Sequence, residues 1–190
     1  MQEENRSALK EWAAMEQILA AGSSCVLLRK GGIWEKKGDF RVEHREFWIF
    51  PTHFHQNPQE ISPEFAWALE PGATAPHDPD RIRIEHYAVV QDEVRVDDLD
   101  TLQRLEGLHA LDAATVESRF RYRDRLYLHV LVLRLYRMPR PYVVPNTLDY
   151  EGCVSWVELD DALSTAGAIP VLSDAEFASR RSEVLRRLSL

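Results

Sequence analysis

Seven arginines within residues 119–140 are the strongest chemical signal in the sequence. Asp124 is the only acid in this window, so the window carries a net charge of +6 and the rest of the chain carries −14. Tyrosines are interleaved with the arginines. Guanidinium groups bind phosphates through paired hydrogen bonds, and aromatic rings stack on bases. The window predicts a phosphate-binding surface that includes Arg119, Tyr122 and Arg134. The alternative is a solvated edge whose arginines pair with acids elsewhere.

Arg134 differs from the other arginines because it lies inside the apolar run 131–135. A buried cation needs a paired anion. We therefore expect Arg134 to contact either an internal carboxylate or a ligand.

A second basic motif, Arg29-Lys30-Gly31-Gly32, directly follows a predicted buried strand. A glycine pair lets backbone N–H groups approach a phosphate, with the two cations beside it. The motif is neither Gly-x-x-x-x-Gly-Lys nor Gly-x-Gly-x-x-Gly. All four residues are candidate binding residues, and a hairpin turn with two solvated cations is the alternative.

Histidines and a carboxylate around the predicted strand 46–50 form the third candidate site. His44, Glu46 and His55 are candidate acid–base catalysts, and Gln56 is a candidate binding residue. His53 and His55 are candidate ligands of a divalent metal, and a catalytic site would need a third ligand and an open position. We assign no metal site, and the cofactor is unknown. The alternative is that these histidines cap a strand end.

Composition excludes several classes of protein. The chain has 190 residues, of which 45% are hydrophobic and 28% charged, as in ordinary globular proteins. A net charge of −8 excludes a protein that coats nucleic acid through overall charge. Cys25 and Cys153 form no Cys-x-x-Cys pair, and both are expected to be buried, reduced thiols. No apolar signal peptide or membrane span is predicted, so we expect a cytoplasmic protein.

Hydrophobic periodicity predicts the elements that must position these residues. Helices are expected over residues 7–21, 99–108, 113–120, 160–166 and 174–188, with Ser7 and Ser173 as caps. Strands are expected over residues 25–28, 46–50, 81–96, 126–136 and 154–159. We predict a single domain over residues 1–190 with a disordered N-terminus at 1–6. Its class is mixed α/β (α+β), with one mixed, largely antiparallel sheet and packed helices.

Several segments resemble the bacterial domain-of-unknown-function 1802 family, from about residue 8 to residue 188. They include Leu28-Arg29-Lys30-Gly31-Gly32, His44-Arg45-Glu46-Phe47, Arg134-Leu135-Tyr136 and Pro170-Val171-Leu172-Ser173-Asp174. Some relatives are reported fused to restriction-type endonuclease domains, so the resemblance implies a nucleic-acid context and a link to restriction or defence systems. Residues 26–30, 47–51 and 155–160 are also similar to strands of the Nudix fold. However, no Arg-Glu-x-x-Glu-Glu helix follows Pro51.

Three functions remain open at this point. The first is a nucleic-acid- or nucleotide-associated module whose partner is DNA, RNA or a nucleotide. The second is a phosphodiester or nucleotide hydrolase that uses the His and Glu residues. The third is an interaction domain that binds a protein partner or forms a homodimer, which the five tryptophans would serve.

Overall fold

A mixed seven-stranded sheet with helices on both sides forms the centre of the computed structural model, which describes residues 1–30, 42–53, 56–152 and 154–189. The strand order is β2-β5-β4-β3-β1-β6, and β7 pairs with β5. The pair β1–β3 is parallel and the other pairs are antiparallel. The predicted mixed α+β class is therefore confirmed. The strands are β1 Glu4–Trp12, β2 Val26–Arg29, β3 Glu46–Thr52, β4 Arg81–Val96, β5 Leu128–Pro145, β6 Trp156–Ser164 and β7 Ile169–Pro170.

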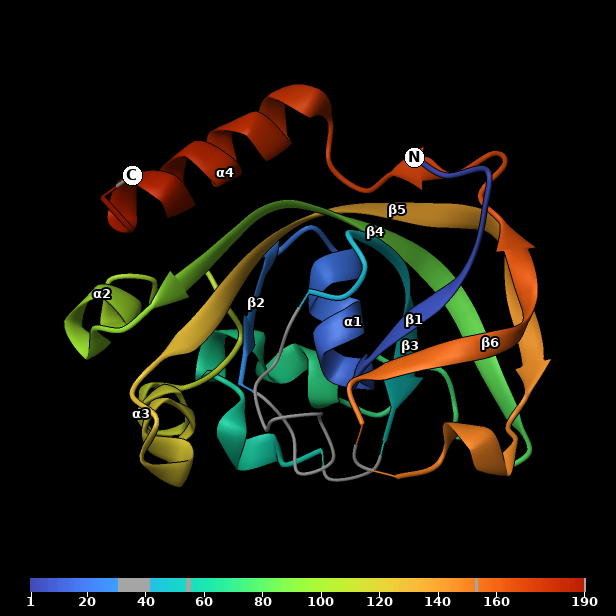
Figure 1. Cartoon of the computed structure of the whole chain (residues 1–190), viewed down its shortest axis with the longest axis horizontal. Coiled ribbons are helices and arrows are strands. Elements are labelled where there is room, and N and C mark those ends of the chain that lie inside the picture. The colour runs from blue at the N-terminus through green and yellow to red at the C-terminus, as the bar shows by residue number, and fades with distance from the viewer. Residues whose placement is uncertain (31–41, 54–55, 153, 190) are drawn as a thin grey trace.

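Two helices flank the sheet from opposite sides (Figure 1). α4 runs over β5 and β4 on one side, and α1 lies on the other side beneath the arch of these strands. Short helical segments follow β3 and β4. The helices are α1 Ala13–Ala20, α2 Leu99–Gln103, α3 Ala113–Arg121 and α4 Asp174–Arg187, and the 3₁₀ segments are η1 Pro58–Glu60, η2 Pro63–Leu69, η3 Tyr122–Asp124 and η4 Leu148–Tyr150.

The long strands β4 and β5 bend the sheet. Their register shifts between Ile84 and His86 and again between Val90 and Asp92. The first shift leaves residues 138–141 of β5 unpaired and the second leaves Gln91 of β4 unpaired, and such irregularities bend a strand and increase its twist. The apolar residues form two buried clusters, one around α1 and one around Trp48 and Tyr87.

The prediction of a helix over residues 7–21 is wrong for its first half. Residues from Glu4 to Trp12 form β1, and α1 begins only at Ala13. Ser7 lies within the strand instead of capping a helix. The strand also begins inside the segment 1–6, which was expected to be disordered, and the Asn5 side chain donates to Tyr87 Oη at 3.0 Å.

Other predicted boundaries also differ from the structure: α2 ends at Gln103 instead of residue 108, and β5 runs on to Pro145 instead of ending at residue 136. The helix expected over residues 160–166 is wrong, because β6 continues through Asp160 and Asp161 to Ser164. β3 does not stop at Pro51 but extends to Thr52, since it lies beside the parallel strand β1.

Other elements agree with the sequence. β4 covers the predicted residues 81–96, and α3 begins at Ala113 as predicted. Ser173 caps α4 as predicted, and it forms a capping box in which its side chain accepts from the backbone of Glu176. Cys25 is a free, buried thiol whose pKa burial raises to about 11. Cys153 lies outside the described residues. No helix in the described ranges is long and apolar enough to cross a membrane.

His109 makes stability depend on pH. Its Nδ1 atom is buried and has no hydrogen-bond partner in the described part of the chain. Burial lowers its pKa to about 4, although a backbone hydrogen bond at Leu111 opposes the shift. The unfolded chain titrates His109 near its ordinary pKa of about 6.5. Between these two values the unfolded state holds a proton that the folded state lacks, so stability falls as the pH falls.

We expect wild-type protein to lose about 2 kcal/mol more unfolding free energy between pH 7 and pH 5 than His109→Leu. Urea unfolding of both proteins at both pH values measures this difference. An equal loss in the two proteins would contradict the assignment to His109.

Candidate functional site

A groove of about 1560 Å³ opens at the edge of the sheet where β1 and β3 end. The β1–α1 segment and the end of β3 form one wall, and residues 69–78 form the facing wall. The start of β4 and residues 150–152 line the remaining sides. Small-molecule pockets usually have volumes of about 300–1,000 Å³. This groove therefore has room for a ligand larger than a single small molecule.

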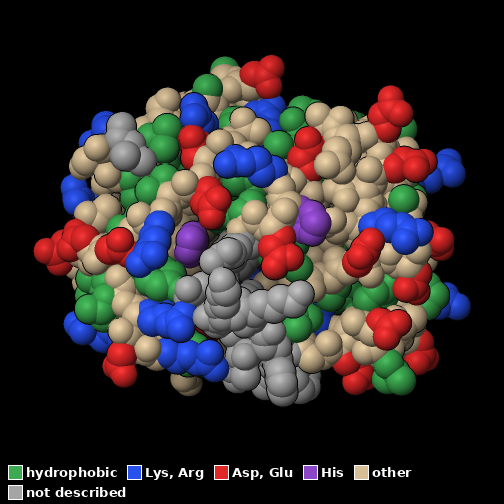
Figure 2. All heavy atoms as spheres, viewed as in Figure 1, with side chains coloured by type: hydrophobic (Ala, Val, Ile, Leu, Met, Phe, Trp, Pro, Cys, Tyr) green, Lys and Arg blue, Asp and Glu red, His purple; other side chains and the backbone are tan. Residues whose placement is uncertain are grey.

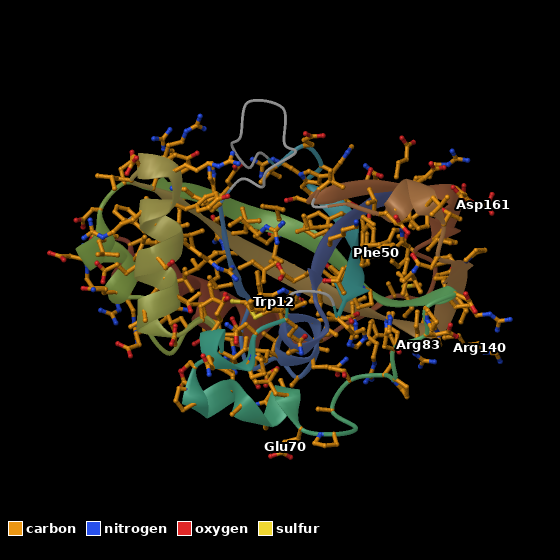
Figure 3. The ribbon with its side chains drawn as sticks, turned by 90° about the horizontal axis from the view of Figure 1, so that it is seen from below. Trp12, Phe50, Glu70, Arg83, Arg140 and Asp161 are labelled. Carbon is orange, nitrogen blue, oxygen red and sulfur yellow. The ribbon has the colours of Figure 1, made fainter. Side chains whose placement is uncertain are left out.

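Figure 3 shows how the groove is surrounded. Trp12 and Phe50 lie on the sheet side, and Arg83 lies farther along the same opening. Glu70 lies on the loop that faces them. Arg140 points outward at the margin of the molecule and does not line the groove.

The parallel pairing of β1 and β3 brings the aromatic wall together. The register places Lys10 beside Phe50 and Trp12 beside Thr52. Carboxyl ends of parallel strands meet at the same edge of a sheet, so these side chains lie together there. The Lys10 ammonium donates to the carbonyl oxygens of Tyr150 and Gly152, the latter at 3.1 Å. It thereby ties the segment after β5 to the floor of the groove.

Imidazole and guanidinium groups also line the groove, near the end of β3 and the start of β4. The rings of His53 and His77 lie 5.1 Å apart between centroids. Partial burial, and secondarily the charge of His77, lower the pKa of His53. Arg83 forms an exposed ion pair with Glu85. The groove therefore holds polar groups that a ligand could contact.

Arg29 links the two ends of the sheet. It lies in β2, and its guanidinium donates to Glu11 Oε2 of β1 at 2.9 Å and to Ser155 Oγ at 2.8 Å. Strands β2 and β6 stand at opposite ends of the sheet, and Ser155 directly precedes β6. The sheet therefore curves until its ends approach each other. Both Arg29 and Glu11 are largely buried, so their charges neutralise each other inside the protein.

Three predicted binding residues converge on the β1–α1 junction. Arg29 binds Glu11, as described above. Arg119 lies over the ring of Trp12, with Cζ 5.0 Å from the centroid, and forms an ion pair with Glu60 at 3.0 Å. Gln56 Oε1 accepts a hydrogen bond from the backbone N–H of Ala14 at 3.1 Å and so caps the start of α1. The junction also supplies one wall of the groove.

Lys30 has structural contacts. Its ammonium donates to the carbonyl oxygens of Phe120 at 2.9 Å and Tyr127 at 2.8 Å, and also to that of Arg125. These contacts hold the end of α3 against β2. The predicted partners Gly31 and Gly32 lie outside the described residues.

Arg134 lies away from the groove. Its guanidinium is buried under α4, where it donates to Ser173 O at 3.1 Å and to Asp174 Oδ1 at 2.7 Å. Of the two partners that the sequence left open, the structure provides a carboxylate of the same chain, although the Asp174 side chain is itself exposed. Cζ also lies 4.9 Å from the ring centroid of Phe177. Arg134 therefore fixes the start of α4 to the sheet.

The remaining arginines of the window do not form one surface with Arg134. Arg121 and Arg123 lie at the end of α3, near the exposed Tyr122, whereas Arg137 and Arg140 lie exposed far along β5. A strand rises about 3.3 Å per residue, so the path from the start of β5 to Arg140 is roughly 40 Å. Basic and acidic side chains are interspersed on the face in Figure 2.

The predicted acid–base and metal residues are spread over different places. His44 packs against Trp156, with ring centroids 5.3 Å apart. Glu46 accepts hydrogen bonds from the backbone N–H of Gln2 at 2.6 Å and from the Tyr87 hydroxyl at 3.0 Å. His53 lines the groove, and His55 lies outside the described residues. Across the described ranges, no three His, Cys, Asp or Glu side chains are grouped to hold a metal ion.

Lys10, Trp12, Glu16 and Arg83 line the groove, and sequence reasoning missed them as site residues. The first three belong to a segment that was interpreted as one helix, which concealed the strand and its edge. The predicted strand 81–96 held a signal that could have indicated a buried partner such as Glu16. His86 falls on the apolar face of this predicted strand, and an imidazole on such a face needs a partner.

Comparisons with known proteins identify the family of the chain. They also find solved structures, whose similarity to this chain is low. A mutant of ZmASCH from Zymomonas mobilis has 13% sequence identity and a TM-score of 0.47, over 96% of this chain and 98% of that chain. ASCH from the same organism has 13% identity and a TM-score of 0.44, over 93% and 92%. The comparisons give no support to the Nudix-like resemblance, and no curated protein matches. The profile of Domain of unknown function (DUF1802) matches residues 8–183, so the chain belongs to this family.

Proposed function

We propose that the protein binds a short single-stranded nucleic acid, or a nucleotide, in the groove between the β1–α1 junction and residues 69–78. The observation that carries this proposal is the composition of the groove. An indole ring and two guanidinium groups line the same open channel. Single-stranded nucleic acids bind to grooves that combine these two features.

Trp12 is the stacking platform in this proposal. It is half-buried, whereas the neighbouring rings of Phe50 and Tyr150 are buried and pack edge-to-face at 5.5 Å. The buried rings support the wall, and Trp12 offers indole surface to a base. Arg119 over Trp12 adds a cation beside the platform. Arg119 itself does not line the groove, so it acts only through its contact with Trp12.

The phosphates would lie toward Arg81 and Arg83, at the start of β4. Both arginines line the groove, and both side chains are exposed. The facing rim carries the acids Glu70 and Asp78, which repel phosphate. Glu85, the ion-pair partner of Arg83, also lines the β4 side, so a phosphate would compete with it for the guanidinium group, and the acids of the groove keep non-specific binding weak. The proposal therefore assigns two or three phosphate contacts to the groove, fewer than a continuous basic surface would make.

This proposal places the phosphate contacts in the groove instead of in the arginine-rich window 119–140. Arg134 already binds the start of α4, and the other arginines of the window are dispersed.

A link to restriction or defence systems stays a prediction that rests on the family resemblance. A protein partner or a homodimer also stays a prediction.

A fluorescence titration tests the proposal. The labelled ligands are single-stranded and double-stranded DNA and RNA and mononucleotides, each at several salt concentrations. We expect single strands to bind best. Each phosphate contact to a single strand contributes about −0.7 to the log–log salt slope, so the slope should be about −2. Arg83→Gln should weaken binding roughly threefold to tenfold and reduce the magnitude of the slope by about one contact.

Arg140→Gln is the matched control, because it also removes an exposed arginine from a long strand but lies outside the groove. It should leave affinity and slope unchanged. If no ligand binds at low salt, or if the two variants weaken binding equally, the groove is not the binding site.

A further inference from the structure

A buried carboxylate and imidazole meet at the floor of the groove. Glu16 of α1 and His86 of β4 are 5% and 3% exposed, and Glu16 Oε1 lies 2.8 Å from His86 Nδ1. Burial raises the pKa of the Glu16 carboxyl, and the hydrogen bond with His86 partly opposes this shift. Glu16 also lines the groove. Within the described residues its second oxygen, Oε2, makes no hydrogen bond.

His86 determines what Oε2 offers to a ligand. The proton that the pair shares lies between Oε1 and Nδ1, on whichever atom holds it. In both arrangements Oε2 carries lone pairs and no proton, so it is a hydrogen-bond acceptor. Oε2 is not among the buried atoms of the described residues that lack a partner, so it is open to solvent from the groove. A ligand that donates to Oε2 replaces the solvent there, whereas a ligand that presents an oxygen displaces the solvent and leaves two acceptors facing each other.

We propose that Glu16, held by His86, makes the groove select bases that carry an exocyclic amino group, such as cytosine, over keto bases such as uracil. This inference rests on the proposed function. Carboxylates accept hydrogen bonds from the N4 amino group of cytosine. Uracil has O4 at the same position, which would face Oε2 with lone pairs on both atoms. His86 positions the carboxylate and does not contact the base.

Cytosine and uracil are useful probes because they have the same size. Oligonucleotides of the two bases with equal length share their phosphates and nearly the same stacking surface. Their affinity ratio therefore isolates the base edge from the phosphate and stacking contacts that carry the proposed function.

The experiment is a titration of wild-type protein with oligocytidine and oligouridine of equal length. We expect oligocytidine to bind at least tenfold more tightly. Glu16→Met keeps the length of the side chain and removes the acceptor, so the ratio should fall to within about threefold of one. Glu64→Gln removes an exposed carboxylate that does not line the groove and should keep the wild-type ratio.

A change in the ligand makes the test independent of protein folding. An oligonucleotide of the 4-deamino analogue of cytidine, which has hydrogen in place of the amino group, should bind wild-type protein at least fivefold more weakly than oligocytidine. Equal binding of the cytidine, uridine and deamino oligonucleotides would overturn the role of Glu16 and leave the proposed function intact. If none of the three binds, both the proposed function and this inference fail.

Discussion

Arg134→Ala should lower the free energy of unfolding by about 3 kcal/mol, because it removes a buried charged group and its hydrogen bonds. The guanidinium holds Ser173 O and Asp174 Oδ1 at the start of α4 and covers the ring of Phe177. Its loss opens a cavity under the helix as well as breaking these bonds. For a protein of this size the melting temperature should fall by roughly 6–12 °C.

Arg140→Ala is the control, since Arg140 is an exposed arginine of the same strand. Its melting temperature should stay within about 2 °C of wild type, as expected for an exposed substitution. Thermal unfolding followed by circular dichroism measures both variants. Similar melting temperatures for the two alanine variants would mean that Arg134 does not anchor α4.

Trp12→Leu should weaken binding of a single-stranded oligonucleotide by roughly 5- to 150-fold, because base–aromatic stacking contributes about 1–3 kcal/mol per base. Leucine keeps an apolar side chain against the core, where Trp12 is partly packed. The titration used for the wild-type protein measures the change.

Trp67→Leu is the matched control for this prediction. Trp67 is 37% exposed in η2 and does not line the groove, so its replacement should leave affinity unchanged. Melting curves of both variants separate a loss of binding from a loss of folding. Equal affinities of wild type and a folded Trp12→Leu protein would contradict the stacking role.

Elements whose apolar residues follow one clear period could be predicted from the sequence. Alternation along residues 81–96 identified β4, and Ser173 followed by a polar first turn identified α4. The segment 7–21 was ambiguous because β1 continues directly into α1 at Ala13 without an intervening turn. Its apolar residues therefore fit helical spacing across both elements. Only the pairing of β1 with β3 and β6 defines it as a strand, and this pairing is not local in sequence.

The candidate site could be predicted only in part. Arg29, Gln56 and Arg119 come together at the β1–α1 junction, although the sequence placed them in three separate candidate sites. Arg134 could be predicted to be buried with an anion, but its partner lies 40 residues away on α4. Likewise, Glu16 and His86 are 70 residues apart. Such contacts depend on the curvature of the sheet, which short sequence patterns do not record.

Photo-crosslinking tests most directly whether the groove binds nucleic acid. Wild-type protein would be irradiated with a single-stranded oligonucleotide that carries a photoreactive base, digested with trypsin and mapped by mass spectrometry. Trypsin cleaves after lysine and arginine, so residues 11–29 and 46–81 form two separate peptides that hold most of the groove wall. We predict crosslinks in these two peptides. Crosslinks confined to residues 120–140 would place the ligand on the arginine-rich strand and contradict the proposal.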